Sequence, residues 1–233
     1  MKRTEFDQFA HAYRARHAEN IRASGEAPEY FADYKARDLA RLLVGDSLRA
    51  PTIRILDFGS GTGAAVEHVK RHIPMGEITC ADVSFESLRI GHARFGDSAL
   101  FLAFDGKALP FSDGSFDSAI ASCVFHHIPA DEHIPLLSEL RRILAADGLL
   151  LVYEHNPLNP LTRYAVNECP FDTNAVLIRP GSMKKSLHAA GFHRVDVRFR
   201  VFFPRPLAGL RPLERCLTWL PLGAQYYAAA RKR

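Results

Sequence analysis

The sequence predicts an α/β protein in which helices cover both faces of a largely parallel sheet. Two observations lead to this fold class. Short apolar runs alternate with helix-like segments from residue 53 to residue 154, which is the order of βαβ units. The first run ends in a turn with Gly59, Gly61 and Gly63 at alternate positions. Glycine permits the positive φ of such a turn and lets a ligand approach the backbone closely.

The composition is that of an ordinary globular protein, with 233 residues, 47% of them hydrophobic and 24% charged. The net charge of +4 is not concentrated as nucleic-acid binding requires, so no nucleic-acid partner is expected. The four cysteines are widely spaced and form no C-x-x-C pair, which argues against a metal site and fits the reducing cytoplasm. No signal-like or membrane-spanning apolar run is present in the sequence.

The glycine turn indicates a nucleoside-containing ligand. The spacing is G-x-G-x-G, preceded by Asp57 and including Ser60, whereas dinucleotide folds favour G-x-G-x-x-G. No Lys-Ser/Thr pair follows to make a P-loop. Asp82 ends the second apolar run, 23 residues after Gly59, where an acidic side chain accepts hydrogen bonds from ribose hydroxyls. Helix capping is the alternative role for Asp82, but Ser84 already serves it.

Two helices are expected before the first strand, at residues 4–18 and 27–45, and together residues 1–50 would form a helical lid over a main domain of residues 51–233. Their aromatic residues recur at helical spacing. Most of these aromatics are expected to pack on the sheet, and Tyr13, Tyr30 and Lys35 are the candidates for ligand contact.

The central part of the chain contributes three more strands. Residues 99–104 and 115–122 are apolar runs, and a helix at residues 131–148 leads into the fifth strand at 149–154. His126 and His127 follow the fourth strand, at the carboxyl edge where open α/β sheets bind ligands. Glu154, His155 and Asn156 begin the segment after the fifth strand, so we expect them near the two histidines.

Residues 154–180 are expected to form an irregular acceptor loop, because prolines and asparagines crowd their first half. A helix at 183–191, a strand at 192–204, a brief apolar helix at 209–223 and a final strand complete the chain. The apolar stripe around residues 207–220 carries arginines. Core packing is the commoner fate of such a stripe, and a lipid-facing amphipathic patch is the alternative.

The order of these features from residue 52 to residue 156 resembles the class I S-adenosylmethionine-dependent methyltransferases of the small-molecule, type 11 group. The resemblance rests on the glycine turn, the acidic residue Asp82, the LPF…FD stretch at 109–117 and the histidine pair. The resemblance implies a Rossmann-like sheet of seven strands with the last antiparallel, S-adenosylmethionine as cofactor and S-adenosylhomocysteine as product. It also implies that Asp105 binds the adenine amino group, although a plain turn before Gly106 is the alternative. The cofactor residues implied are Asp57, Gly59, Ser60, Gly61, Asp82, Val83, Asp105, Gly106, Ser122, Cys123, Tyr13, Tyr30 and Lys35.

The expected reaction is methyl transfer to a small-molecule, sugar-linked or lipid-linked acceptor, on oxygen, with carbon and nitrogen as the alternatives. A hydroxyl acceptor benefits from a general base, and His127 is the first candidate, with His126 and His155 in reserve. Packing beside the cofactor is the alternative role for the histidine pair. Three other functions stay open: a nicotinamide-dependent oxidoreductase, a non-catalytic cofactor-binding module, and an RNA or protein methyltransferase. The sequence leaves the oligomeric state undetermined and permits weak contact with a membrane surface.

Overall fold

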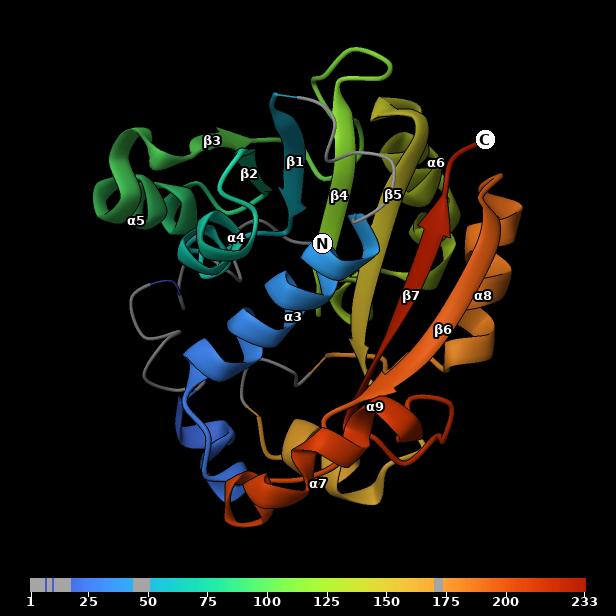
Figure 1. Ribbon diagram of the computed structural model, residues 1–233. Helices are drawn as coiled ribbons and strands as arrows, with labels where there is room; N and C mark the ends of the chain where they lie inside the picture. The colour runs from blue at the N-terminus through green and yellow to red at the C-terminus, as the bar shows by residue number, and fades with distance from the viewer. Residues whose placement is uncertain (1–6, 8–9, 11–17, 44–50, 170–173) are drawn as a thin grey trace.

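The computed structural model describes residues 7, 10, 18–43, 51–169 and 174–233. They form a seven-stranded sheet in the order β3-β2-β1-β4-β5-β7-β6 (Figure 1). Strands β1 to β5 pair in parallel, and β7 runs antiparallel to both of its neighbours. This confirms the predicted sheet with its antiparallel last strand. The strands are β1 (Ile53–Phe58), β2 (Gly76–Asp82), β3 (Leu100–Ala103), β4 (Phe116–Ser122), β5 (Leu144–His155), β6 (His193–Arg200) and β7 (Gln225–Arg231).

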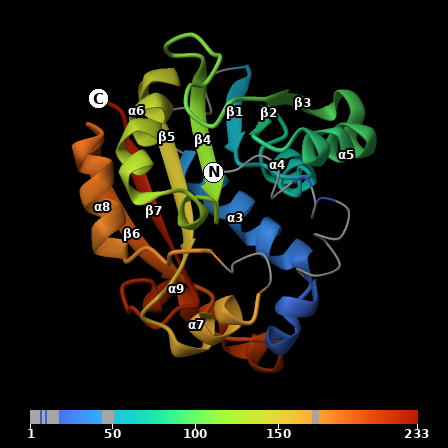
Figure 2. The ribbon, with the colours of Figure 1, turned by 180° about the vertical axis from the view of Figure 1, so that it is seen from behind.

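Helices lie on both faces of this sheet, as Figures 1 and 2 show. One face carries α3 (Pro28–Leu43), α4 (Val66–His72) and α5 (Phe85–Phe95), and the other carries α6 (His133–Ile143) and α8 (Pro180–Ala189). The carboxyl-edge end of the sheet is capped by α7 (Pro160–Asn167) and α9 (Glu214–Leu217). Short 3-10 turns are η1 (Arg22–Ser24), η3 (Gly96–Ser98), η4 (Phe125–His127), η5 (Ala130–Glu132) and η7 (Arg205–Leu213).

Strand β5 shows why the sheet has two cores. Leu149, Leu151 and Tyr153 belong to the apolar cluster under α3 and α4. The alternate residues Leu150 and Val152 belong to the cluster under α6 and α8. Because successive side chains of a strand point to opposite faces, a strand covered on both sides must be apolar throughout.

Three local expectations were wrong. The helix predicted to reach Gly148 ends at Ile143, and residues 144–148 already belong to β5. The segment predicted as irregular contains α7, because Pro160 lies in the first turn, where a missing N–H costs nothing. The side chain of Asn159 caps this helix by accepting hydrogen bonds from two backbone N–H groups. The prolines and asparagines therefore start a helix here instead of preventing one.

The third error concerns the apolar stripe of the last quarter of the chain. Leu207, Leu210, Leu213 and Trp219 are exposed, by 44% to 67%, and not part of a core. The segment is mostly 3-10 turn, with only four residues of α-helix.

The predicted helix at residues 27–45 corresponds to α3, and Tyr34, Leu39 and Leu43 pack into the core beside β1. Tyr34 therefore packs against the sheet, as was expected for most aromatic residues of this helix. The helix predicted at 4–18 lies almost wholly outside the described residues, as does Tyr13, so the lid and its boundary near residue 50 stay predictions. Within the described part, no helix is both long and apolar enough to cross a bilayer.

Candidate active site

The glycine turn after β1 adopts the conformation that its sequence predicts. Gly59, Gly61 and Gly63 have φ of +70°, +53° and +74°, which is the region that glycine occupies without strain. A side chain at Gly59 would meet Val124 Cγ2 at 2.5 Å, whereas a Cβ at Gly61 would meet no atom within 4 Å. The two glycines therefore serve different ends, since Gly59 allows close internal packing and Gly61 leaves open space.

A pocket beside this turn is the candidate site for the cofactor. Its lining includes Asp57, Ser60, Gly61, Lys35 and Ser122. Within the described part of the chain, the buried hydroxyl oxygen of Ser60 makes no hydrogen bond of standard geometry, and its interaction is with the weakly bonding thiol of Cys80. A hydroxyl with spare hydrogen-bonding capacity and the open space at Gly61 fit a polar ligand lying across the turn. The residues present therefore fit S-adenosylmethionine.

Two buried carboxyl groups lie near the glycine turn: Asp57 lines the pocket, and Asp82 ends β2 and contacts Gly61. Burial, helped by the nearby charge of Asp82, raises the pKa of Asp57 to about 7, against the opposing effect of Lys35. Burial also raises the pKa of Asp82, although backbone hydrogen bonds oppose the shift. Asp82 accepts hydrogen bonds from the N–H of Gly61 at 2.7 Å and from the N–H of Ser84 at 2.8 Å. These bonds fix its carboxylate at the glycine turn, and each oxygen keeps a lone pair for a ligand.

The residues predicted to bind the adenine end lie at the neighbouring strand end. Val83 is buried beyond Asp82, and Gly106 lies against it. Asp105 is in the exposed turn after β3, where its Oδ1 accepts hydrogen bonds from the N–H groups of Lys107 and Ala108. These bonds lower the pKa of Asp105. Asp105 thus stabilises the turn before Gly106, which was the alternative role considered for it. Its contact with adenine stays a prediction.

Tyr30 is not among the residues that line the cofactor pocket. Its ring packs against the guanidinium of Arg211, whose Cζ is 4.4 Å from the ring centroid, and against the ring of Tyr34. Lys35, one turn further along α3, does reach the pocket. The structure therefore brings Lys35 to the cofactor side and leaves Tyr30 against the C-terminal part of the chain.

Lys35 also contacts the end of β4. Its Nζ is 3.5 Å from Cys123 Sγ, and Cys123 has the positive φ of 59° that is uncommon for a side chain with a Cβ. Burial would raise the pKa of the Cys123 thiol, but the charges of Lys35 and His155 outweigh it and lower the pKa to about 7. A half-buried thiol that is partly ionised at neutral pH therefore lies beside the cofactor pocket.

The three predicted histidines do come together at the carboxyl edge. The ring centroid of His126 is 4.1 Å from that of His127 and 5.2 Å from that of His155. His126 is buried, and its Nδ1 is 2.6 Å from Oε2 of the fully buried Glu154. Burial alone would raise the pKa of Glu154, but the charge and hydrogen bond of His126, with a contribution from His155, lower it.

The turn that carries the histidine pair is held rigidly. The second carboxylate oxygen of Glu154 accepts a hydrogen bond from the N–H of Phe125 at 2.8 Å. His133 Nε2, from helix α6, donates hydrogen bonds to the carbonyl oxygens of Phe125 and Ile128. Both ends of η4 are therefore fixed by buried side chains, which is what a positioned catalytic group needs.

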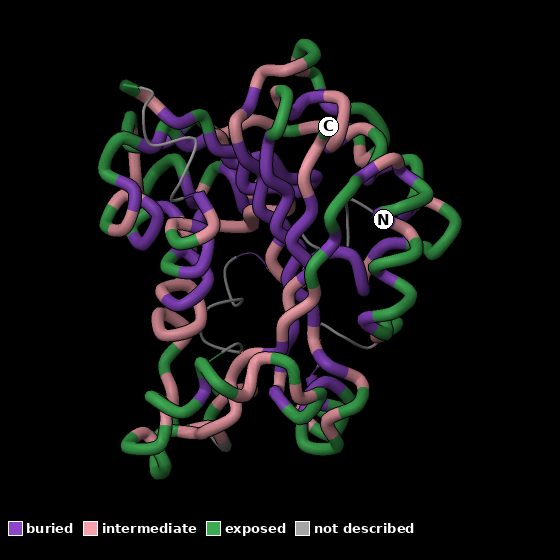
Figure 3. The backbone as a smooth tube through the Cα atoms, turned by 45° about the vertical axis from the view of Figure 1, so that its right-hand side comes forward, coloured by how far each residue is buried: buried purple, intermediate pink, exposed green. Residues whose placement is uncertain are grey.

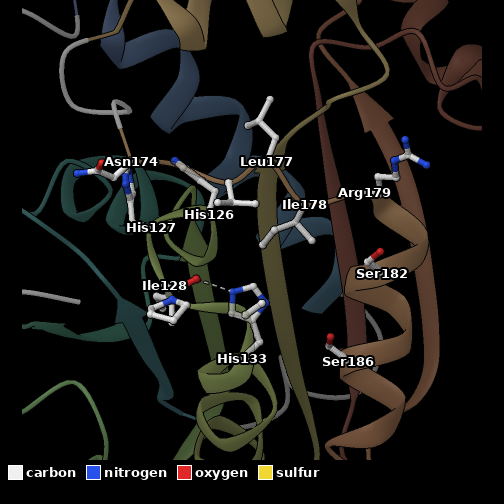
Figure 4. Close-up of a pocket in the computed structure, with 13 residues that line it drawn as sticks. His126, His127, Ile128, His133, Asn174, Leu177, Ile178, Arg179, Ser182 and Ser186 are labelled. Atoms are coloured by element: carbon white, nitrogen blue, oxygen red, sulfur yellow. Dashed lines mark hydrogen bonds between the residues drawn. The ribbon is translucent and has the colours of Figure 1, made fainter.

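A second, larger cavity of about 720 Å³ opens on the other side of the histidines. Figure 4 shows His126 and His127 at one end of it, with Ser182 and Ser186 of α8 along the opposite wall. Residues 176–179 line it as well, and they belong to the segment predicted as the acceptor loop. His126 and His127 thus line a cavity large enough for an acceptor, and neither is among the residues that line the pocket beside the glycine turn.

Sequence reasoning assigned no role to Glu154 or Gln225. Gln225 begins β7, and its Nε2 lies 3.7 Å from Cys123 Sγ, while its Oε1 accepts a hydrogen bond from Tyr34. One signal for Glu154 was available, since an acidic residue directly after the apolar run LLLVY needs a buried partner. Gln225 gave no comparable signal.

Comparison with known proteins agrees with this geometry. A family model described as a methyltransferase domain matches residues 56–152. A ubiquinone/menaquinone biosynthesis C-methyltransferase from Bordetella avium is 32% identical over 137 residues, covering 55% of this chain and 53% of that protein. A malonyl-[acyl-carrier protein] O-methyltransferase from Geobacter sulfurreducens is 34% identical over 98 residues, covering 41% and 36%. The chain spans about half the length of the first curated relatives it matches.

The solved structures extend the likeness to the whole chain at the level of fold. A methyltransferase from Thermotoga maritima, described as a possible histamine N-methyltransferase, superimposes with a TM-score of 0.69. The match covers 99% of both chains at 21% sequence identity. Taken with the strand order and the glycine turn, these likenesses show that residues 56–152 match a methyltransferase domain and that the chain has the Rossmann-like fold of S-adenosylmethionine-dependent methyltransferases.

Proposed function

We propose that this protein transfers the methyl group of S-adenosylmethionine to an oxygen of a small-molecule, sugar-linked or lipid-linked acceptor. The observation that carries the proposal is the buried pair of Glu154 and His126, 2.6 Å apart, with His126 lining the larger cavity at the carboxyl edge of the sheet. A carboxylate behind an imidazole fixes its tautomer and increases its basicity. A hydroxyl acceptor needs such a base, because the hydroxyl must lose its proton as the new bond forms.

The cofactor, when bound, supplies an activated methyl group on a sulfonium, so the chain mainly has to orient two molecules. Asp82 is suited to accept hydrogen bonds from the ribose hydroxyls. Lys35 is suited to pair with the carboxylate of the amino-acid end, since its ammonium reaches the same pocket. Ser60 and the backbone at Gly61 line this pocket and are suited to contact that ligand.

The geometry favours His126 over His127 as the base. His126 is the ring that the Glu154 carboxylate holds, and it still borders the acceptor cavity. His127 is half-buried beside it and lines the same cavity, where it is placed to contact the acceptor. His155 lies behind the pair, towards Cys123, and its interaction with the thiol suits it to a supporting role.

The two relatives suggest what the acceptor resembles. One is named for carbon methylation in quinone biosynthesis and the other for oxygen methylation of a malonyl thioester. Both reactions have acceptors that are small groups, and neither name includes RNA or protein methylation. A base next to the methyl donor serves carbon acids as well as hydroxyls, so carbon methylation is the second candidate.

The test is transfer of a labelled methyl group from S-adenosylmethionine into an extract of the source organism. The extract is then separated into lipid, glycan, small-molecule, RNA and protein fractions. Label confined to one of the first three, and absent with the His126→Ala variant, is the expected result. Label in RNA or protein would contradict the acceptor class. No labelled product from an enzyme that binds S-adenosylmethionine in a separate calorimetric measurement would favour a non-catalytic binding module.

A further inference from the structure

The exposed apolar side chains of this protein gather at one end. The described residues include thirteen exposed large hydrophobic side chains, and eight of them come from two short segments. A soluble surface normally scatters such residues singly, and a contiguous group marks an interaction site. The eight are Leu158, Leu161, Tyr164, Leu207, Leu210, Leu213, Trp219 and Leu222. We call residues 158–164 and 207–222 the apolar end.

The two segments of the apolar end are fixed to one another. Asn159 Nδ2 donates a hydrogen bond to the carbonyl oxygen of Leu222 at 2.7 Å. Thr162 Oγ1 donates to the carbonyl oxygen of Ala224, and Asn156 Nδ2 donates to those of Pro221 and Gly223. Helices α7 and α9 consequently lie together at the same end of the molecule in Figures 1 and 2. The apolar end is therefore one surface that the fold holds in place.

Exposed arginines border this surface, and Glu168 at the end of α7 is an exposed carboxylate beside them. Arg163, Arg205 and Arg215 are exposed on the two segments and their immediate neighbours. The acidic residue among positions 205–222, Glu214, is buried. Its Oε1 accepts hydrogen bonds from the N–H groups of Phe202 and Phe203, so its charge is directed inward. Apolar side chains with a rim of arginines are complementary to a surface that is apolar inside and anionic outside.

The apolar end lies at the carboxyl ends of the parallel strands. Strand β5 ends at His155 and leads through Asn156 directly into α7, so the catalytic edge and the apolar end are consecutive in the chain. Figure 3 shows exposed and half-buried backbone predominating at this end, beyond the buried strands. A surface bound here would lie on the side of the sheet from which ligands enter.

We propose that the apolar end binds the surface of a membrane that contains anionic lipids, with its leucines and Trp219 inserted between headgroups. The short helices suit this role, because an interfacial element needs only one apolar face and a basic rim. The proposal goes beyond the methyl-transfer reaction and does not depend on it, since membrane binding is measured without acceptor or cofactor. Its consequence for the reaction is that an acceptor dissolved in the membrane would meet the enzyme at the carboxyl edge.

The experiment uses Trp219, the one tryptophan in the sequence, as its own reporter. Its side chain is 67% exposed, so its emission should be that of an indole in water. Vesicles of phosphatidylcholine with one quarter phosphatidylglycerol should shift the emission to shorter wavelength and carry the protein upward in a flotation gradient. Vesicles whose acyl chains carry bromine should quench the Trp219 emission. Raising sodium chloride to 500 mM should weaken the binding, because surface charges are then screened.

Matched variants separate the apolar and charged contributions. Leu161→Ser removes a side chain that is 79% exposed, and Leu100→Ser, 59% exposed on β3 at the far edge of the sheet, is its control. Reversing Arg163 and Arg215 together to Glu should lower vesicle partitioning at least about tenfold. Reversing the exposed Lys184 and Lys185 of α8 in the same way should change it little. All variants should keep the wild-type affinity for S-adenosylmethionine, which shows that they are folded.

Several results would overturn the proposal. Emission that does not change with anionic vesicles at low salt would show that no insertion occurs. Equal, salt-insensitive binding to pure phosphatidylcholine would remove the role of the arginines. The Trp219 emission could already be shifted to shorter wavelength without vesicles, while light scattering gives a molecular mass that rises with concentration. That result would show that a second copy of the chain covers the apolar end.

Discussion

The Nδ1 atom of His126 lies 2.6 Å from Oε2 of Glu154, and neither side chain is more than 2% exposed. The residues are 28 positions apart in sequence: Glu154 lies in β5, and His126 lies in η4, which follows the adjacent parallel strand β4. A buried carboxylate next to an imidazole stabilises the protonated ring, and it fixes which ring nitrogen faces away.

The first prediction concerns Glu154→Gln. Glutamine keeps the shape and the bond from Phe125 N–H but removes the charge, so the basicity of His126 falls. We expect kcat to drop by about 10²-fold and the rising limb of the pH profile to move to lower pH. A fall in kcat with an unmoved limb would mean that Glu154 only supports the fold. Glu168→Gln, at the exposed end of α7, is the control.

The second prediction concerns Asp82→Asn. Losing one charged acceptor should weaken S-adenosylmethionine binding by roughly 10- to 100-fold, which corresponds to a charged hydrogen bond of about 1.5–3 kcal/mol. Titration calorimetry measures the change. Asp117→Asn is the control, because Asp117 pairs with Arg54 at the start of β1, away from the pocket. If both variants bind the cofactor alike, Asp82 is no ribose ligand.

The third prediction separates the two glycines of the turn. Gly59→Ala adds a Cβ 2.5 Å from Val124 at a φ of +70°, so the free energy of unfolding should fall by about 3 kcal/mol or more. Gly61→Ala meets open space and should cost only about 1–2 kcal/mol. The cofactor affinity of Gly61→Ala should nevertheless fall more than tenfold if the ligand occupies that space. Denaturant unfolding and calorimetry together decide, and an unchanged affinity would place the cofactor elsewhere.

The fourth prediction is a pH dependence at Cys123. The pKa of about 7 means that half of the thiol is ionised near neutral pH, so alkylation by iodoacetamide should rise to its plateau through pH 7. Lys35→Met removes the nearby cation and should move the midpoint to higher pH, because the thiolate loses its main stabilising charge.

Mass spectrometry of the peptide containing Cys123 measures this rate, and the exposed Cys216 provides an internal control for the reagent. Bound S-adenosylmethionine should slow the alkylation, since Lys35 and Ser122 line the cofactor pocket next to the thiol. A midpoint identical in wild type and Lys35→Met would contradict the pairing of Lys35 with Cys123.

The sequence by itself determined the fold class and predicted the cofactor end of the site. The alternation of apolar runs and helices, the positive-φ glycines and the acid at Asp82 are local patterns, so a single stretch of chain specifies them. The convergence of His126, His127 and His155 was also predictable, because the carboxyl ends of adjacent parallel strands meet at one edge.

Only the tertiary structure decided which of these residues act together. The pairing of Lys35 with Cys123 joins residues 88 positions apart, and Glu154 becomes a partner of His126 through the register of β4 and β5. The stripe at residues 207–222 illustrates the same limit, since its leucines are exposed although core packing was expected. An amphipathic pattern states that one face is apolar, but what covers that face depends on which elements the rest of the chain brings to it.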